Sequence, residues 1–247
     1  MRLMLVAALV NLFLLPMLAA QPYRVELVRA APGSWLEVID LYRLQASVLV
    51  AAGEEPPLIM RHSQGDQWDL MILSPVSPLA EYFSPERAEQ RDRAARGVGA
   101  ASSRELEAQL RARIAWRAEL FATGPPHGEL RNRRENASFF HIEMFRALPG
   151  KHAALREQRE MENAFLRASD RPDNLVFERI VGAGWDAFTI GFYRDLRHFA
   201  EDSDLSDDAL EEAARRAGFE ARNRIGTYLR TLIDSHHDTL ATLVHGR

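Results

Sequence analysis

The chain has 247 residues and carries 35 acidic against 31 basic side chains, a formal net charge of −4. Because this charge is small and negative, the composition argues against a surface that binds nucleic acid. The chain has no cysteine, which excludes disulfides, thiolate metal sites and a cysteine nucleophile. Its length allows one large domain or two of about a hundred residues each.

The N-terminal segment has the pattern of a secretory signal peptide. Met1 and Arg2 form a short basic start, residues 3–15 are almost continuously apolar, and the small residues Ala19 and Ala20 follow. We predict a signal peptide over residues 1–20, cleaved near Ala20, and a periplasmic or secreted protein. An uncleaved anchor and a start at Met17 remain alternatives. No later segment has the roughly 20 apolar residues of a membrane span, so no stable span is expected after cleavage.

The next segments predict a strand, a helix and a hairpin. From Tyr23 on, apolar side chains alternate as in a half-buried strand. Pro32 and Gly33 end this strand, and Ser34 with a glutamate three residues later predicts a capped helix that closes at Gly53. The later patterns predict two hairpin strands at residues 58–60 and 68–73, a helical region that is interrupted at residues 96–101, and a closing strand at residues 118–123.

The same order of elements returns in the second half of the chain. An ungapped shift of 117 positions aligns residues 23–69 with residues 140–186, and eleven of these 47 positions are identical. The second set of predicted strands covers residues 139–147, 175–181, 185–192 and 238–244. We therefore divide the chain into a signal peptide (residues 1–20), a first ferredoxin-like repeat (residues 21–123), a linker (residues 124–137) and a second ferredoxin-like repeat (residues 138–247).

The order strand, helix, strand, strand, helix, strand is the ferredoxin-like βαββαβ unit. Helices cover only one face of such a sheet, so its other face must be covered by a further layer. A second copy provides that cover. The predicted fold is α+β, with the two repeats packed sheet to sheet as an intramolecular pseudo-dimeric α/β barrel.

The repeated Gly-x-x-Trp-Asp turn and the Pro-Gly break after the first strand point to a known group of proteins. The turn stands at residues 65–69 and 182–186, and the break at residues 32–33 and 149–150. With these motifs, the chain resembles the dimeric α/β-barrel superfamily, which includes antibiotic-biosynthesis monooxygenase-like and NIPSNAP-like proteins. The resemblance implies a ferredoxin-like fold and activities that include cofactor-free oxygenases, haem-degrading enzymes and isomerases.

Strand periodicity selects candidate site residues on the first strand of each repeat. We expect the apolar set that contains Tyr23, Val25 and Leu27 to face the helices, and the alternate set to face the partner sheet. A buried carboxylate needs a partner, so the alternate set is either an ion-pair network between the sheets or a polar pocket with a general base. The catalytic candidates are His141, Glu143 and Glu26. The ligand-binding candidates are Arg24, His62, Arg179, Phe145 and Val28.

Other conspicuous side chains have structural explanations. Trp68 and Trp185 are expected to anchor the hairpins in the core, Asp69 and Asp186 to cap the turns, and His152 to be exposed. His236 and His237 point to opposite faces of any extended segment, so we predict no metal site there but a connection between a helix and a strand. No nucleotide-binding, serine-hydrolase or zinc-protease motif is present in the sequence, and we expect no cofactor.

Three functions remain open. The first is an exported barrel protein that binds a small apolar or aromatic molecule between its two sheets. The second is a cofactor-independent monooxygenase or isomerase, with a haem-related enzyme as a variant. The third is a non-catalytic structural or partner-binding protein. Fusion of two copies removes the need for a dimer, although a homodimer remains a candidate assembly.

Overall fold

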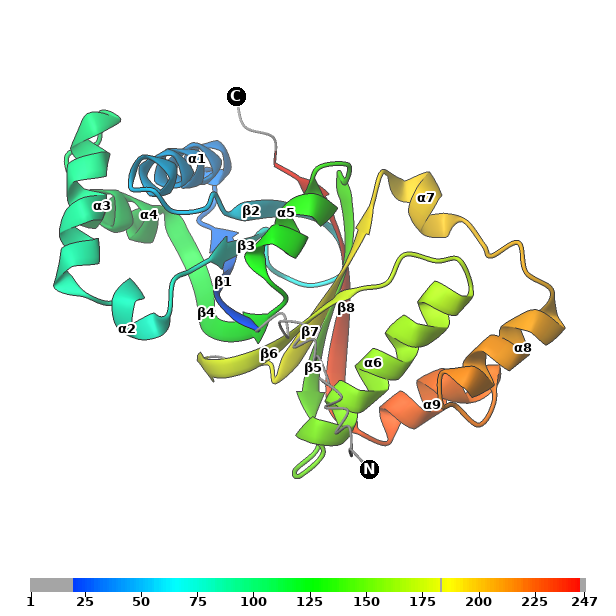
Figure 1. Cartoon of the computed structure of the whole chain (residues 1–247). Helices are drawn as coiled ribbons and strands as arrows, with labels where there is room; N and C mark the ends of the chain where they lie inside the picture. The colour runs from blue at the N-terminus through cyan, green and yellow to red at the C-terminus, as the bar shows by residue number, and fades with distance from the viewer. Residues whose placement is uncertain (1–19, 183, 245–247) are drawn as a thin grey trace, which may run out of the picture.

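The computed structural model describes residues 20–182 and 184–244. Eight strands close into an antiparallel barrel in the order β1-β3-β2-β8-β5-β7-β6-β4 (Figure 1). The predicted signal peptide lies outside the described residues, apart from Ala20. The strands are β1 (Gln21–Ala30), β2 (Leu58–Gln64), β3 (Leu70–Pro75), β4 (Ile114–Gly124), β5 (Phe139–Ala147), β6 (Leu175–Gly182), β7 (Ala187–Tyr193) and β8 (Ile233–Leu243).

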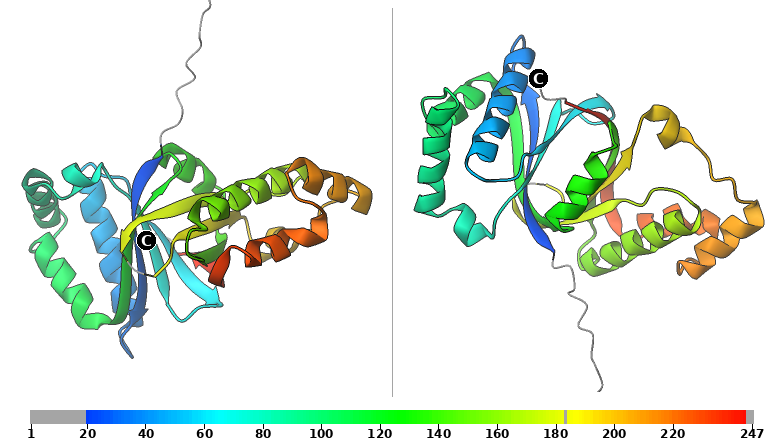
Figure 2. Two further views of the ribbon diagram at one scale, coloured as in Figure 1. Left: turned by 90° about the horizontal axis from the view of Figure 1, so that it is seen from below. Right: turned by 45° about the horizontal axis from the view of Figure 1, so that its top comes forward.

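Helices connect the strands and lie outside the barrel. They are α1 (Trp35–Ala51), α2 (Leu79–Tyr82), α3 (Pro85–Gly97), α4 (Ser103–Arg113), α5 (His127–Arg134), α6 (His152–Ala168), α7 (Leu196–Ala200), α8 (Asp207–Arg216), the 3-10 helix η1 (Arg222–Arg224) and α9 (Ile225–Arg230). Figure 2 shows α1, α3 and α4 on one side of the barrel, and α6, α8 and α9 on the other. None of these described helices is both long and apolar enough to cross a membrane.

Two groups of four strands form the barrel, and their pairings match. In the first group β1 pairs with β3, so that Glu26 lies opposite Ile72. In the second group β5 pairs with β7, so that Glu143 lies opposite Thr189. The second pair follows the first by 117 positions in both strands, so the sequence shift is preserved in the strand register. The predicted α+β class and the antiparallel order of strands are confirmed.

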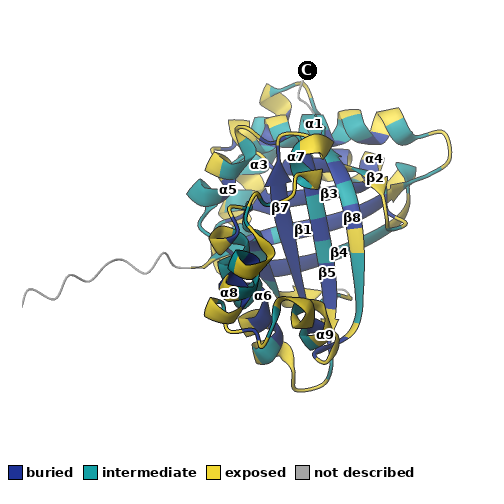
Figure 3. Cartoon of the chain, turned by 90° about the vertical axis from the view of Figure 1, so that its right-hand side faces the viewer, coloured by how far each residue is buried: buried dark blue, intermediate teal, exposed yellow. Residues whose placement is uncertain are grey.

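The interior of the barrel is filled by apolar side chains from both groups of strands. Tyr23 of β1 contacts Phe177 of β6 edge to face, at 5.1 Å between ring centroids, and Phe177 stacks on Phe188 of β7 at 4.6 Å. One continuous buried cluster includes these residues together with Val25, Leu27, Phe140, Ile142 and Met144. Figure 3 shows the buried strands behind the more exposed helices.

This packing reverses the predicted faces of the first strands. We expected Tyr23, Val25 and Leu27 to face the helices, but they face the barrel interior. The alternate residue Val28 packs instead with Val38 and Tyr42 of α1. The physical reason is that a closed barrel excludes water from every interior position and so takes the more apolar set. The helix-covered face takes the charged side chains, which form ion pairs with one another there.

Glycines close the two seams between the groups of strands. Gly65 lies at the β2–β8 seam and Gly182 at the β4–β6 seam, with φ angles of 123° and 114°. A Cβ atom would lie 2.2 Å from the carbonyl oxygen of Asp238 at the first position and 2.5 Å from that of Glu119 at the second. Only glycine fits such a close approach of two backbones. This explains the glycine of the repeated Gly-x-x-Trp-Asp turn.

Several local predictions needed correction. Helix α5 occupies most of the predicted linker, and β4 and β8 begin at Ile114 and Ile233, earlier than expected. Because β8 begins early, His236 and His237 lie within a strand and not in a connection. Ser34 precedes α1 without a side-chain capping bond, so the predicted capping box is wrong.

Candidate functional site

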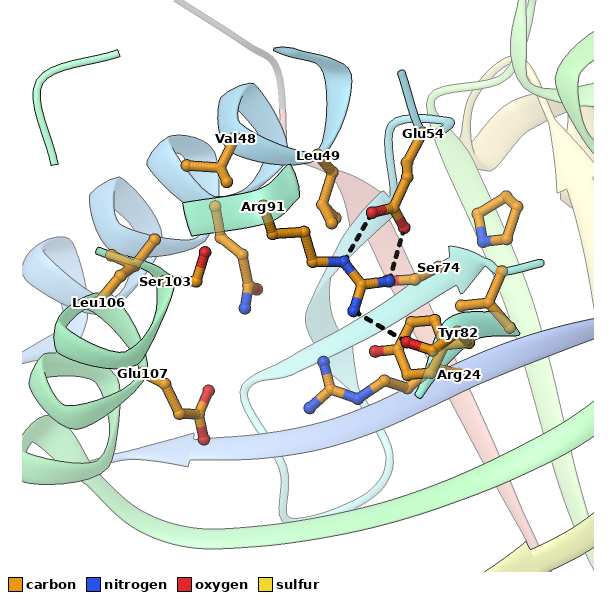
Figure 4. Close-up of a pocket in the computed structure, with 13 residues that line it drawn as sticks. Arg24, Val48, Leu49, Glu54, Ser74, Tyr82, Arg91, Ser103, Leu106 and Glu107 are labelled. Atoms are coloured by element: carbon orange, nitrogen blue, oxygen red, sulfur yellow. Dashed lines mark hydrogen bonds and ion pairs between the residues drawn. The ribbon is translucent and has the colours of Figure 1, made fainter. Parts of the chain in front are cut away.

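The first group of strands and its helices enclose a small cavity. It has a volume of about 130 Å³ and lies between the outer face of β1 and β3 and the helices α1 to α4 (Figure 4). Its wall is apolar at Val48, Leu49, Val76 and Leu106. The remaining lining residues are mostly polar or charged: Arg24, Gln45, Glu54, Ser74, Pro75, Tyr82, Arg91, Ser103 and Glu107.

Arg24 brings a largely buried guanidinium group to this cavity. Its side chain is 13% exposed, and Figure 4 shows it reaching from β1 into the cavity. Nη1 lies 2.8 Å from Oε1 of Glu26, and Nε donates to Oε1 of Glu119 at 2.7 Å. No described residue accepts a hydrogen bond from Nη2. Nη2 of this buried cation is therefore free to bind a ligand.

Glu26 lies behind Arg24, beneath α1, and is 1% exposed. Oε2 accepts a hydrogen bond from the hydroxyl of Tyr42 at 3.3 Å and lies 3.2 Å from Nε of Arg117. Oε1 is close to Arg24 but has no donor in hydrogen-bonding geometry among the described residues. Burial raises the pKa of Glu26, and this effect exceeds the opposing attraction of Arg24 and Arg117.

Two further carboxylates complete the network around Arg117. Nη1 of Arg117 donates to Oε1 of Glu107 at 2.8 Å, and Nη2 donates to Oε2 of Glu119 at 2.7 Å. Burial opposes ionisation of Glu119, but hydrogen bonds from Arg24 and Arg117 hold its pKa at about 2. Burial also opposes ionisation of Glu107, but hydrogen bonds from Arg111 and Arg117 outweigh this effect and lower its pKa. Both groups are therefore ionised at neutral pH.

An ion pair at the side of α2 and α3 holds the outer wall of the cavity. Nε and Nη2 of Arg91 donate to the two carboxylate oxygens of Glu54 at 2.6 and 2.8 Å. The same guanidinium lies over the ring of Tyr82 at 4.2 Å from the centroid. Burial raises the pKa of the Tyr82 hydroxyl, which keeps the phenol neutral. These bidentate and stacked contacts hold the Arg91 side chain in place, so that it forms part of the cavity wall.

The predicted catalytic residues in the second half of the chain form a different network. Glu143 and His141 lie on the outer face of β5, beneath α6. Oε2 of Glu143 accepts from Nη1 of Arg159 at 3.3 Å and from Oγ1 of Thr189 at 3.1 Å. Nε2 of His141 lies 3.4 Å from Oδ1 of Asp238.

Glu26 and Glu143 consequently do not meet at a central interface. β1 and β5 are four strands apart in either direction around the barrel. Because both carboxylates point outward, the barrel wall and its packed interior separate them. This corrects the predicted arrangement, which followed from the reversed strand faces.

The other predicted ligand-binding residues lie away from the cavity. Val28 and Phe145 are fully buried beneath the helices of their own halves. His62 packs against Trp68 with ring centroids 5.7 Å apart, and Arg179 forms an ion pair with Asp186. Of the five ligand-binding candidates, only Arg24 lines the cavity.

The structure also shows what the remaining conspicuous side chains do. Trp68 is buried in the barrel core and Trp185 packs partly against it, as predicted. The carboxylates of Asp69 and Asp186 accept from the backbone of Ala30 and Ala147, so they fasten β3 and β7 to the ends of β1 and β5 and do not cap their own turns. His152 is mostly exposed, as predicted.

His236 and His237 point to opposite faces of β8, as expected for neighbours in a strand. His236 stacks on Phe145 under the helices, and Nδ1 of His237 lies 3.0 Å from Oδ2 of Asp66. In the part of the chain that the structure describes, no group of three or more His, Asp or Glu side chains is arranged to hold a metal ion.

Sequence reasoning missed most of the cavity wall. Tyr82, Arg91 and Glu107 belong to the helical region between β3 and β4, which the ungapped alignment of residues 23–69 does not cover. The only signal in the sequence was Arg24 itself, a charged residue between apolar neighbours on a predicted strand.

Comparison with known proteins supports the fold. No family model matches the chain, and no curated protein matches it. Three solved structures align over most of their length. One is a proposed monooxygenase from Lactobacillus acidophilus, with 8% identity, coverage of 90% of this chain and 94% of that chain, and a TM-score of 0.51. Another is an anthrone oxidase-like protein, with 12% identity, 92% coverage of both chains and a TM-score of 0.53.

The third is a proposed monooxygenase from Fusobacterium nucleatum, with 11% identity, coverage of 93% of this chain and 94% of that chain, and a TM-score of 0.52. At such low identity, the likeness establishes the fold alone. The chain shares the α+β barrel fold of these three solved structures.

Proposed function

We propose that this protein is a cofactor-independent monooxygenase whose substrate binds in the cavity between β1, β3 and the helices α1 to α4. The observation that carries this proposal is Arg24, a buried guanidinium group with one free donor at the cavity. The names of the structural neighbours, proposed monooxygenases and an anthrone oxidase-like protein, favour oxygenation over isomerisation. Fold likeness alone does not assign chemistry, so the argument rests on the cavity.

The proposed reaction converts a CH₂ group of the substrate, which a phenol presents in its keto tautomer, and O₂ into a carbonyl group and water. The substrate gives up four electrons to O₂; one oxygen atom becomes the carbonyl oxygen of the product, and the other leaves as water with the two hydrogens of the CH₂ group. The substrate loses a proton to the ionised carboxylate of Glu107 in the cavity wall, which later gives it up to the departing water. This loss places negative charge on an oxygen atom conjugated with the reacting carbon. Nη2 of Arg24 stabilises that charge, as preorganised donors do in other enzymes. Glu26 and Glu119 act as positioning residues that hold the guanidinium.

The location replaces the predicted site between the two sheets. That space is occupied by the aromatic and aliphatic side chains of the barrel interior. A binding protein without turnover remains the second candidate, since the same cavity and the same free donor serve binding as well as chemistry.

The two halves of the chain and its N-terminal segment support two further points, on how the barrel arose and where the protein is located. We infer that the barrel is a fused pseudo-dimer of two homologous units, because the 117-residue shift recurs in the strand register. The basic start and apolar run of residues 1–15 support export and cleavage near Ala20. Mass spectrometry of protein recovered from its native cell envelope tests this point; an intact N-terminus at Met1 would refute cleavage.

Oxygen consumption tests the enzymatic proposal. Purified protein, assayed against small phenols and cyclic ketones in an oxygen electrode, is expected to consume O₂ with at least one of them. Arg24→Lys keeps the buried charge but removes Nη2, so it is expected to abolish turnover in a folded protein. Arg93→Gln is the matched control, because Arg93 is an exposed arginine on α3. Ligand binding without any O₂ uptake would favour the binding protein.

A further inference from the structure

The chemistry of the cavity wall restricts the ligand that the cavity accepts, and this argument rests on the proposed location of the site. The first restriction is charge. Arg24 is already paired with two carboxylates, and Arg91 with one. Together with Arg117, these three guanidinium groups face four carboxyl groups, on Glu26, Glu54, Glu107 and Glu119. Arg111 adds a fourth cation only from the solvent side, where water and salt screen it.

The cavity therefore has no surplus of positive charge. A carboxylate or phosphate ligand would lie close to ionised Glu107 and Glu119 without a cation of its own. Like charges at this distance repel strongly where water is excluded. The wall accordingly selects an uncharged ligand.

The second restriction comes from a free donor of the cavity wall that faces a free acceptor. Figure 4 shows Arg24 on β1 and Glu107 on α4 pointing toward each other across the cavity. Nη2 of Arg24 has no acceptor among the described residues. Both hydrogen bonds of Glu107, from Arg111 and Arg117, go to Oε1, so Oε2 has no described donor. A hydroxyl group satisfies both sides at once, because it accepts from Arg24 and donates to Glu107.

The third restriction is size. A cavity of about 130 Å³ is close to the roughly 150 Å³ of an apolar cavity that binds benzene. The walls formed by Val48, Leu49, Val76 and Leu106 suit the faces of one ring. We infer that the ligand is an uncharged, single-ring hydroxylated compound of the phenol class, with its hydroxyl group between Nη2 of Arg24 and Oε2 of Glu107.

Binding of four matched compounds to the full mature chain tests this inference. Calorimetry measures the affinity for each of phenol, toluene, benzoate and 2-naphthol. Toluene has the shape of phenol without the hydroxyl group, benzoate adds a negative charge, and 2-naphthol adds a second ring. Phenol is expected to bind about tenfold or more tightly than toluene, because the hydroxyl group gains hydrogen bonds to two charged groups. Benzoate and 2-naphthol are expected to bind more weakly than phenol, the first because of charge and the second because of size.

Variants assign the preference to the named groups. Glu107→Gln is expected to reduce the ratio of phenol to toluene affinity several-fold, and toluene binding should stay unchanged. Glu105→Gln is the matched control, since Glu105 is exposed on the same helix and accepts only from Gln109 in the described structure. Leu49→Phe narrows the cavity and should weaken both ligands, which identifies the cavity as the binding site.

Each outcome has a distinct meaning. Benzoate binding as tightly as phenol, or an unchanged ratio in Glu107→Gln, would overturn the phenol inference and leave the proposed site intact. If none of the four compounds binds, or if Leu49→Phe leaves their binding unchanged, the cavity is not the ligand site and the proposed function falls with it.

Discussion

The two halves of the barrel place their buried cation on different elements. Around Glu26 the guanidinium groups come from strands, on Arg24 and Arg117, and α1 contributes the neutral Tyr42. Around Glu143 the guanidinium comes from α6, on Arg159, which stands 117 positions after Tyr42. His141 takes the position that corresponds to Arg24.

The different position of the cations in the two halves determines what occupies the space between sheet and helix. Arg159 is 1% exposed, reaches Glu143 and Glu162, and lies over the ring of Phe145 at 4.7 Å. Its side chain therefore fills the region beneath α6. In the first half the cations extend from strands, Arg24 lines the cavity, and space remains beneath the helices for a ligand. The same fold thus provides a protein-filled polar core in one half and a cavity in the other.

The sharpest test of this comparison is Arg159→Met. The change leaves Glu143 and Glu162 beneath α6 without their cation, and an uncompensated buried charge costs about 3–5 kcal/mol. Urea unfolding should show a loss of that size in the free energy of unfolding. Arg156→Gln, an exposed arginine of the same helix, should change it by less than about 0.5 kcal/mol. Equal effects of the two changes would show that Arg159 is not a structural core residue.

The two seams of the barrel offer the next comparison. Gly65→Ala and Gly182→Ala each place a Cβ atom within 2.5 Å of a carbonyl oxygen across a seam. Because each position also has a positive φ, we expect each substitution to lower the unfolding free energy by about 2–4 kcal/mol. Gly150→Ala is the control, because its φ is 76° but no atom lies within 4 Å of the new Cβ. It should cost only about 1 kcal/mol. If Gly150→Ala loses as much unfolding free energy as the two seam variants, the positive φ alone accounts for the loss.

The β2–β8 seam also has a contact between a carboxylate and a histidine, which has no counterpart among the described residues of the β4–β6 seam. Oδ2 of Asp66 accepts from Nε1 of Trp68 at 3.2 Å and lies 3.0 Å from Nδ1 of His237. At the β4–β6 seam, Ala118 occupies the position that corresponds to His237. We expect Asp66→Asn to cost about 1–2 kcal/mol in unfolding free energy, because it weakens two hydrogen bonds to a carboxylate with 3% exposure. No loss of stability in chemical unfolding would show that the seam depends on backbone pairing alone.

The sequence predicted more of the fold than of the site. The repeat and the alternation of Tyr23 and its neighbours were sufficient for two antiparallel units and a closed barrel. They could not show which strand face is inside, because helices bury one face and the barrel buries the other. Alternation distinguishes two faces and does not orient them. The positions of Tyr82 and Arg91 depend on how α2 and α3 pack over β1, which local patterns do not encode.

The smallest expected effect concerns pH and compares Glu119 with Asp238, its counterpart on β8. The pKa of Glu119 is about 2 in the folded protein against an ordinary value of 4.5. Ionised Glu119 therefore stabilises the fold above about pH 4.5, and this contribution is lost as the pH falls from 4.5 toward 2. A hydrogen bond from His141 lowers the pKa of Asp238 as well, but Asp238 is half exposed and has no guanidinium partner in the described structure.

We expect Glu119→Gln to flatten the acid limb of the stability profile more than Asp238→Asn does. The measurement is the free energy of unfolding from urea titrations at intervals between pH 5 and pH 2.5. Two guanidinium groups hold Glu119, and both keep their charge throughout this range, so its contribution depends only on its own protonation. If the two variants flatten the profile equally, the strand-borne arginines give the first half no electrostatic advantage, and the contrast between the halves reduces to the space beneath their helices.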